Sequence, residues 1–344
     1  MEWVVGRPQR LIDFLKTKAA EGFSVKAIRR ALDVNACRVN GRVERFASKG
    51  LFSGDRVSFT APLVEKKEIQ PLSVLFEDEY VKVLDKPSGW VCEDAALRRA
   101  LGPRHWLIHR LDKDTSGLLL VAKMPEVKEL FISLFEEKAV SKLYLALADG
   151  VCREASVRQE SWLIRKKTFA GQTIWGSSSS RKNTRGALYA STHIETVARG
   201  SQATLFACRP ITGRTHQIRV HLAELNHPIL MDRQYAERFR SPHTFARTLL
   251  HAFRLSFIHP ITQEKIDLCA PLPRDMLSAI RLVGISSGHV SQFLAEQGQK
   301  EGGDGGDDDE ESEEVGKLFF SFHESGEHSS KIKSKSHAYV PKAH

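Results

Sequence analysis

The stretch HRLDKDTSGLLLVAK, residues 109–123, decides the fold prediction, because a polar segment runs directly into an apolar one. Residues 118–121 form a short, continuous apolar run, which indicates a buried strand. Six polar side chains lie between residues 110 and 116, at the start of that strand. The pattern D-x-x-S-G is also an ordinary turn, since Asp and Ser bond nearby backbone and Gly tolerates positive φ. Asp112 is therefore either a turn residue or a functional carboxylate.

Length and composition predict a globular protein that acts in the cytoplasm. The chain has 344 residues, enough for two domains, and is 41% hydrophobic and 27% charged. Its apolar runs are too short to cross a bilayer, and its start lacks the apolar stretch of a signal peptide. The five cysteines are scattered without C-x-x-C spacing, which argues against a zinc knuckle and against a disulfide framework. We expect a reducing, cytoplasmic setting and no membrane association.

The charge of the chain is unevenly distributed. Residues 301–344 contain eleven acidic residues against five lysines, a net charge of −6. Because the whole chain carries +9, the first 300 residues carry +15. A strongly basic body suits a polyanionic partner, nucleic acid first.

Residues 1–65 are predicted to form a small α/β domain. Helical spacing is visible in RLIDFLKTKAA (10–20) and SVKAIRRAL (24–32), and Asn40-Gly41 within CRVNGRVERF is a hairpin signal. SGDRVSF (53–59) is predicted to be a further strand. Basic side chains gather on these elements: Lys26, Arg29, Arg30, Arg38, Arg42 and Arg45. They indicate either an RNA-binding face or an ordinary solvated surface.

This small domain resembles the RNA-binding domain first seen in a small-subunit ribosomal protein. The resemblance is carried by RLIDFL, KAIRRAL, RVNGR and SGDRV. It implies that residues 1–65 bind RNA through Lys26, Arg29, Arg30, Arg38 and Arg42.

A linker over residues 66–73 is expected to lead into a larger domain, residues 74–284. Strands are expected at 80–89, 142–150, 203–210 and 249–260, and helices at 125–138 and 214–225. The remaining residues, 285–344, contain a dense acidic block and a Ser/Lys/His-rich end. Their low hydrophobicity predicts a disordered acidic and polar tail.

Separated motifs in the larger domain together resemble the RluA-type family of RNA pseudouridine synthases. HRLD-x-x-TSG combined with TGRTHQIR is specific, although either motif alone is weak evidence. The resemblance covers roughly residues 74–275, and it implies an α+β fold around a mixed, largely antiparallel central sheet. It also implies isomerisation of uridine in RNA to pseudouridine, with no cofactor and no metal. The stretches that carry it are LDKPSG (84–89), HRLDKDTSG (109–117), KLYLAL (142–147), ITGRTHQIRVHL (211–222) and LLHAFRLSFIHP (249–260).

The resemblance also assigns roles to individual residues. It places the catalytic aspartate at Asp112, the active-site tyrosine at Tyr144 and the basic partner of the aspartate at Arg214. It places an apolar pocket residue at Ile218. Arg110 matches the arginine that fills the gap left by the flipped nucleotide.

These residue types suit the implied chemistry. Breaking a glycosidic bond builds positive charge on the sugar, so an ionised carboxylate can act as nucleophile, base or electrostatic partner. Burial would raise the pKa of Asp112, and an adjacent guanidinium such as that of Arg214 opposes the rise. Tyr144 offers a ring to lie against the base and a hydroxyl for proton transfer. The target uridine has to leave the stacked helix to reach them.

For several of these residues a structural alternative stays open. Tyr144 can be an ordinary core residue, and Arg110 can be a phosphate contact. Arg214 can lie at the start of the following helix, although a cation is unfavourable there. Lys86, in LDKPSG, is either structural or a phosphate contact.

Two further observations limit the reading of this domain. His216 and His221 are five residues apart, which does not place them on one helical face as a zinc pair requires. The chain departs from the family pattern after LDKPSG, and again in NHPILMD, where Asn226 and Met231 stand at positions often taken by glycine. These departures affect loops that face RNA in the predicted fold.

The sequence therefore predicts a cytoplasmic RNA pseudouridine synthase, with ribosomal RNA of the large subunit favoured over transfer RNA and no obligate protein partner evident. Two rivals stay open. One is a non-catalytic RNA-binding or ribosome-assembly protein on the same fold. The other is a different RNA-modifying enzyme, such as a hydrolase, that carries the motifs by coincidence.

Overall fold

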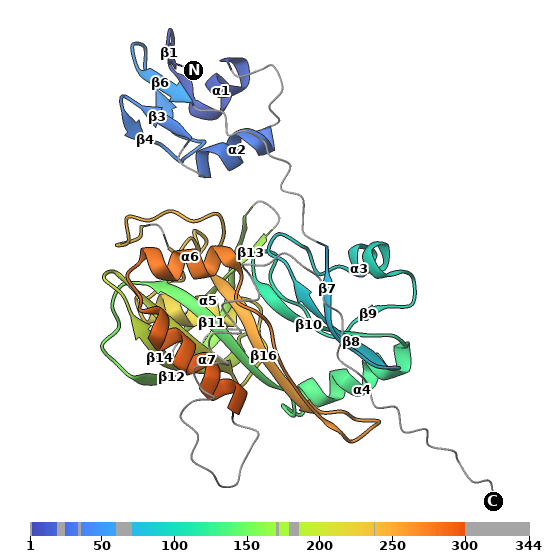
Figure 1. Cartoon of the computed structure of the whole chain (residues 1–344). Coiled ribbons are helices and arrows are strands. Elements are labelled where there is room, and N and C mark those ends of the chain that lie inside the picture. The colour runs from blue at the N-terminus through green and yellow to red at the C-terminus, as the bar shows by residue number, and fades with distance from the viewer. Residues whose placement is uncertain are drawn as a thin grey trace, which may run out of the picture.

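The computed structural model describes residues 2–18, 25–33, 36–59, 71–169, 172–178, 186–236 and 238–299. The N-terminal part, in blue in Figure 1, is a small unit of short strands and two helices. Its main sheet has the order β1-β6-β3-β4, and β2 pairs with β5. The elements are β1 (Glu2–Val4), β2 (Gln9–Arg10), α1 (Leu11–Lys18), α2 (Val25–Asp33), β3 (Cys37–Val39), β4 (Arg42–Val43), β5 (Gly50–Leu51) and β6 (Arg56–Phe59).

The helices of this unit pack on its strands because their apolar residues recur at helical spacing. Leu11, Phe14 and Leu15 of α1 join Ile28 of α2 and Phe59 of β6 in a core cluster of their own. The predicted hairpin is present, with Asn40 and Gly41 at φ of 51° and 79°, the left-handed region that such two-residue turns require.

Among the basic residues predicted to bind RNA, Arg29, Arg38 and Arg42 are exposed. The side chains of Lys26 and Arg30 lie outside the described residues. Of the predicted linker, residues 66–70 also lie outside them.

A large mixed sheet dominates the rest of the described chain (Figure 1). Its main path runs β13-β12-β14-β15-β11-β16-β10-β8-β7, with β17 paired to β16 and β9 to β10. Its described pairs are antiparallel except β10–β16, which is parallel, so the predicted mixed, largely antiparallel sheet is confirmed. The strands are β7 (Ser73–Glu77), β8 (Val81–Lys86), β9 (Trp106–Leu107), β10 (Ser116–Ala122), β11 (Ser141–Asp149), β12 (Ser156–Phe169), β13 (Gln172–Ser178), β14 (Leu188–Arg199), β15 (Ala203–Pro210), β16 (Leu250–Ile258) and β17 (Lys265–Cys269).

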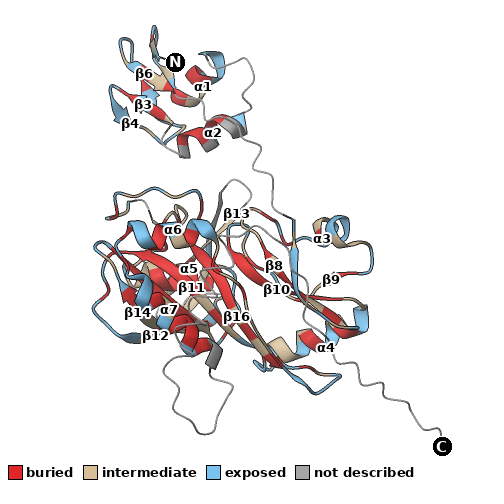
Figure 2. Ribbon diagram, viewed as in Figure 1, coloured by how far each residue is buried: buried red, intermediate tan, exposed pale blue. Residues whose placement is uncertain are grey.

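The centre of this sheet is buried, as Figure 2 shows along β8, β10, β11 and β16. Every residue of β10 is buried, which explains the continuous apolar run that follows the polar segment. The helices that accompany the sheet are α3 (Asp94–Leu101), α4 (Pro125–Glu136), α5 (Gln217–Glu224), α6 (Arg274–Leu282) and α7 (Ser287–Gln299). Among the described helices, none is long and apolar enough to cross a membrane.

Gly117 explains the glycine of the TSG motif. It pairs with Ala252 where β10 and β16 run parallel, and its φ is 104°. A Cβ at this position would collide with the carbonyl oxygen of Ala252, so only glycine allows the strands to approach this closely. Beside it, Ser116 Oγ bonds His251 Nδ1 at 3.0 Å. The motif therefore fixes where β10 begins, and with it the loop that carries Asp112.

One boundary predicted from the sequence is wrong. Residues 285–344 were predicted to be disordered, but α7 is a helix that packs on the main core through Val290, Phe293 and Leu294. In Figure 1, α6 and α7 lie in orange over the half of the sheet that contains β11 and β14. The low hydrophobicity of the whole segment hid three apolar residues at helical spacing. The remaining predicted tail, residues 300–344, lies outside the described residues.

Candidate active site

Asp112 lies in a turn, and its carboxylate reaches out of that turn. The backbone N–H of Thr115 donates to the Asp112 carbonyl at 3.1 Å, which closes the turn before β10. The Asp112 side chain, 25% exposed, instead meets residues 216 and 219, more than 100 positions later in the chain. The two readings of Asp112 thus combine, because the backbone makes the turn and the carboxylate serves the site.

The loop that carries Asp112 is supported from beneath by Lys86. This lysine is fully buried, and its Nζ donates to the carbonyls of Pro87, Trp90 and Lys113 at 2.9 to 3.2 Å. Burial lowers its pKa to about 8. The prediction that Lys86 contacts RNA is wrong, because all three of its donors are directed to backbone carbonyls inside the protein.

His109, the first residue of the HRLD motif, also anchors the loop. Its Nε2 accepts the backbone N–H of Leu120 at 3.0 Å, and its ring lies 5.0 Å from that of Phe135. Burial lowers the pKa of His109 to about 3, so the ring is neutral and able to accept this bond. The polar motif is therefore fastened to β10 on one side and α4 on the other.

Arg219 is the cation that pairs with Asp112. Its Nη1 donates to Asp112 Oδ2 at 2.9 Å. Its Nε and Nη2 donate to both oxygens of Asp232 at 2.6 and 2.8 Å, and Nη2 also reaches Gln234 Oε1 at 2.9 Å. Burial disfavours the charge of Arg219, but the two carboxylates outweigh burial and raise its pKa. The guanidinium is thus held in one orientation, with Asp112 on one edge and buried Asp232 on the other.

The prediction that Arg214 is the partner of Asp112 is wrong. Arg214 is exposed, and its Nε donates to the carbonyl of Tyr189 at 3.2 Å. Helix α5 begins at Gln217, after His216 in the left-handed conformation, so Arg214 lies in the preceding turn. Gln217 holds that turn by accepting from Thr212 Oγ1 and the Arg214 N–H. Arg219 lies within the helix and extends towards Asp112.

His216 completes the contacts of the Asp112 carboxylate. Its Nε2 lies 3.6 Å from Asp112 Oδ1, and its Nδ1 shares a 2.7 Å hydrogen bond with the Tyr235 hydroxyl. Burial lowers the pKa of His216, and the charge of Asp112 opposes that effect. A neutral imidazole therefore stands beside Asp112, while the ring of Tyr235 lies 5.1 Å from the Arg219 guanidinium.

Tyr144 lies near the same carboxylate, on β11. A register shift between Leu143 and Tyr144 interrupts the pairing of β11 with β16. Burial, followed by the charge of Asp112, raises the pKa of Tyr144, so its hydroxyl stays protonated. Tyr144 packs against the main core cluster, in which Ile218 of α5 is buried. The charge of Asp112 thus reaches Tyr144, which packs against the core cluster that contains Ile218 and against another that contains Leu111.

Arg110 is exposed, two residues before Asp112. A guanidinium there is free to meet solvent or a ligand that approaches the loop.

Within the described ranges, no three His, Cys, Asp or Glu side chains gather in a way that could hold a metal ion.

Four residues of the site escaped the sequence analysis as functional residues: His216, Arg219, Asp232 and Tyr235. Arg219 carried a signal, because a charged residue between Ile218 and Val220 of an apolar helix needs a partner. Asp232 and Tyr235 carried no comparable signal. They belong to an irregular segment whose path no periodicity predicts.

Comparison with known proteins agrees with this geometry. Residues 80–224 match the family described as RNA pseudouridylate synthase. The chain is 32% identical over 304 residues to the ribosomal large subunit pseudouridine synthase C of Salmonella typhi, covering 80% of this chain and 93% of that protein. The enzyme of the same name from Escherichia coli (strain K12) is 33% identical over 293 residues, covering 77% and 89%.

Solved structures show the same fold. The human RNA pseudouridylate synthase domain containing 1 superposes with a TM-score of 0.55 at 25% identity, covering 70% of this chain and all of that one. The human RNA pseudouridylate synthase domain containing 4 gives a TM-score of 0.52 at 23% identity, covering 62% and 94%. These neighbours confirm the predicted fold class.

Proposed function

Because this chain belongs to the RNA pseudouridylate synthase family, we propose that it converts uridine to pseudouridine in RNA of the large ribosomal subunit. The enzyme class follows from the family. The choice of RNA is supported by the names of relatives that match over about nine-tenths of their length. These names favour ribosomal RNA over transfer RNA as the substrate.

The observation that carries the assignment of the site is the paired carboxylate of Asp112. One of its oxygens is bonded to Arg219, while the side chain is still partly exposed at the mouth of a buried strand. Such a carboxylate is held in one orientation by the guanidinium and remains within reach of a nucleotide that has left its stack. We assign Asp112 as the catalytic aspartate on this ground.

The reaction exchanges one bond of the sugar for another. The bond from the sugar C1′ to N1 of uracil breaks, the base turns, and C1′ bonds to C5. The proton on C5 leaves, and N1 takes up a proton, so the product is an isomer of the substrate. Positive charge develops on the sugar during cleavage, and the Asp112 oxygen that does not bond Arg219 can stabilise or attack C1′.

The neighbouring residues position this carboxylate and the base. Arg219 holds the Asp112 carboxylate in one orientation, and Asp232 fixes Arg219. Tyr144, protonated and close to Asp112, supplies a ring against the base and a hydroxyl for proton transfer at C5. Exposed Arg110 is assigned to the RNA beside the flipped uridine. Arg214 and Ile218 stand behind these groups, in the turn and the core that support α5.

The N-terminal unit is assigned to RNA affinity. Its exposed Arg29, Arg38 and Arg42 suit phosphate contacts that are independent of sequence. A ribosomal RNA substrate implies that the protein acts in the cytoplasm. Cell fractionation tests this, and we expect the protein to sediment with ribosomal subunits.

The test of this function is the Asp112→Asn variant. The amide keeps the size of the side chain and suits a turn, but it provides neither the charge nor the nucleophile. We expect pseudouridine formation to fall by at least about 10⁴-fold while RNA binding stays within a few-fold of wild type, since affinity comes from cations on phosphates. Chemical mapping of pseudouridine in unmodified large-subunit RNA measures the first, and a binding titration measures the second.

Two results would contradict the proposal. A folded Asp112→Asn protein that still forms pseudouridine at the wild-type rate would remove Asp112 from the catalytic role. Wild-type protein that modifies transfer RNA and leaves ribosomal RNA unmodified would overturn the choice of substrate. Circular dichroism on the same preparations controls for folding.

A further inference from the structure

A surface groove leads away from the active site along the segment that follows α5. Two adjoining hollows of about 410 and 390 Å³ form it, and both are lined by Asn226 and Arg240. The second hollow is also lined by Tyr235, whose hydroxyl bonds His216 beside Asp112. Tyr235 and His216 therefore connect the groove to the Asp112 carboxylate.

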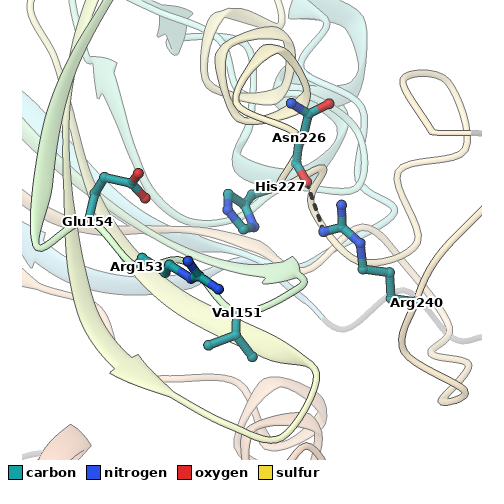
Figure 3. Close-up of a pocket in the computed structure, with 6 residues that line it drawn as sticks. All are labelled: Val151, Arg153, Glu154, Asn226, His227 and Arg240. Atoms are coloured by element: carbon teal, nitrogen blue, oxygen red, sulfur yellow. Dashed lines mark hydrogen bonds between the residues drawn. The ribbon is translucent and has the colours of Figure 1, made fainter.

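The groove is lined by three arginines and one histidine that come from three separate segments. Arg153 comes from the connection between β11 and β12, His227 from the end of α5, and Arg238 and Arg240 from the connection that leads to β16. Figure 3 shows Arg153 and Arg240 approaching His227 from two sides. Segments far apart in the sequence thus line the two adjoining hollows, and Arg240 lines both.

The position of Arg240 is fixed by the fold. Its backbone N–H donates to Asp149 Oδ2 at 2.8 Å, and its Nη1 donates to the Asn226 carbonyl at 3.1 Å (Figure 3). The guanidinium also lies directly over Gly150, where a Cβ would collide with it. A guanidinium has five N–H donors, so others remain to bind a ligand in the hollow.

His227 is fixed in a similar way. Its Nδ1 lies 2.9 Å from the carbonyl oxygen of Asp149, an arrangement in which Nδ1 carries the hydrogen. Its Nε2 is then an acceptor, so His227 shapes the hollow and the arginines supply its donors. Arg240 and His227 are therefore both held by Asp149, one through the carboxylate and one through the carbonyl.

The carboxylates of the groove, Asp149 and Glu154, bond backbone N–H groups and a thiol rather than the arginine side chains. Asp149 is buried, and its two oxygens accept the backbone N–H groups of Arg240 and Ser241. Glu154 is exposed and pairs with the Cys152 thiol. Arginines outnumber carboxylates around the groove, which favours an anionic ligand.

We propose that this groove holds backbone phosphates of the substrate RNA on one side of the flipped uridine. A nucleotide that leaves its stack needs its flanking strand held in place, and guanidinium groups suit phosphate oxygens. Tyr235 lines the groove and also bonds His216, so a strand held in the groove would lie beside the active site. The inference rests on the proposed function only in taking RNA as the ligand.

The test compares two groove variants with a matched control. Arg153→Gln and Arg238→Gln remove exposed arginines at opposite ends of the groove, and Arg281→Gln removes an exposed arginine from α6. Binding of unmodified, transcribed large-subunit RNA is titrated at several salt concentrations. Each groove variant is expected to make the slope of log K against log salt shallower by about one, as one lost phosphate contact does. Arg281→Gln is expected to keep the wild-type slope.

Turnover gives a second readout. The groove variants should raise KM severalfold and leave kcat within about twofold, because the lost contacts are formed equally in ground and transition states. A wild-type slope and KM in the Arg153→Gln, Arg238→Gln double variant would overturn the groove assignment. An equal loss in Arg281→Gln would overturn it too, by showing a general effect of charge. Wild-type protein that binds this RNA without modifying it would count against the proposed function alone, since the slopes can still be compared.

Discussion

Asp112, Arg219 and Asp232 form a row of alternating charge in which the central member is a guanidinium. An arginine suits this position because its planar fork bonds Asp232 through two nitrogens and leaves a third for Asp112. A lysine has one nitrogen and cannot hold both carboxylates in fixed geometry. Asp232 is 1% exposed, and its Oδ1 also accepts the backbone N–H of Gln234 at 3.3 Å, so both partners help to hold the carboxylate.

Removing the central cation is expected to stop turnover. In Arg219→Ala, two carboxylates lose their partner, so kcat should fall by at least about 10³-fold, which corresponds to roughly 4 kcal/mol of transition-state stabilisation. Arg219→Lys should keep kcat below a tenth of the wild-type value, because a lysine cannot bond both carboxylates. Single-turnover kinetics on unmodified RNA measures both variants.

Arg214→Ala is the matched control, because it removes an arginine five positions away in the same motif. We expect kcat within about threefold of wild type, since its guanidinium bonds the carbonyl of Tyr189. If Arg214→Ala were as inactive as Arg219→Ala, the ion pair seen here would not be the one that supports catalysis.

Sequence predicted the aspartate and missed its partner for a physical reason. The role of Asp112 was implied by the resemblance that HRLD-x-x-TSG carries, whereas hydrophobicity alone marks only the buried strand that follows. The choice between Arg214 and Arg219 depends on where α5 begins. His216, at a φ of 58°, breaks the chain direction between them, and such a conformation in a non-glycine residue is not predictable from spacing.

At the scale of elements, α5 carries Arg219 on a helix of only eight residues. Its C-terminus is closed by two backbone bonds, from the N–H of Asn226 to the Ala223 carbonyl and from the N–H of His227 to the Leu222 carbonyl. This is a Schellman motif, in which Asn226 takes the left-handed position with φ of 61°. The departure from glycine noted in the sequence therefore lies at a position that favours glycine.

Asn226→Gly is expected to stabilise the protein. The exposed side chain is not needed by the motif, and glycine removes the strain of positive φ, so the free energy of unfolding should rise by about 0.5 kcal/mol. Asn226→Ala should lower it by about 1 kcal/mol, because alanine lacks the tolerance of Asn for this conformation. Urea unfolding compares the three proteins. A more stable alanine variant would contradict the strain argument.

The last helix, α7, was not predicted from composition, and its contribution to stability can be tested by truncation. A chain ending after residue 286 loses Val290, Phe293 and Leu294 from the main core, and its unfolding free energy should fall by about 4 kcal/mol. A chain ending after residue 299 keeps α7 and should retain both stability and turnover. Equal stability of the two truncated proteins would show that α7 contributes little to the core.

Among the strands, those with a continuous apolar run were the most predictable. Residues 118–121 and 143–147 are apolar on both faces because helices or neighbouring strands cover both sides, and a continuous apolar run shows this directly. The order of strands in the sheet and the parallel pairing of β10 with β16 were not predictable. They depend on contacts between segments about 135 residues apart.

For the whole molecule, the N-terminal unit is predicted to add affinity through charge. Deletion of residues 1–65 should leave a folded catalytic domain that binds RNA more weakly, with a shallower dependence on salt, because phosphate contacts release counterions. Titrations at several salt concentrations compare the deleted protein with the full chain. An unchanged slope would remove the RNA-binding role of this unit.

Three fully buried histidines of the catalytic body couple its stability to pH: His221, His251 and His259. In each, Nδ1 is hydrogen-bonded, and within the described residues Nε2 has no hydrogen-bond partner. Burial lowers the pKa of all three, and that of His251 to about 3. Protonation would therefore place a charge in the core, and only His259 has a carboxylate, Asp78, within 3.4 Å.

Acid is therefore expected to destabilise this protein well above the pH at which carboxylates titrate. The folded pKa of His251 lies below the unfolded value near 6.5, so the unfolded state binds more protons between these values, and stability falls as pH falls below about 6.5. At pH 5 one such histidine costs about 2 kcal/mol. Urea unfolding from pH 7.5 to pH 5 measures the slope, and His251→Gln should reduce it by up to about 1.4 kcal/mol per pH unit, because the amide does not titrate. A His251→Gln protein with the full wild-type slope would show that this histidine does not carry the pH dependence.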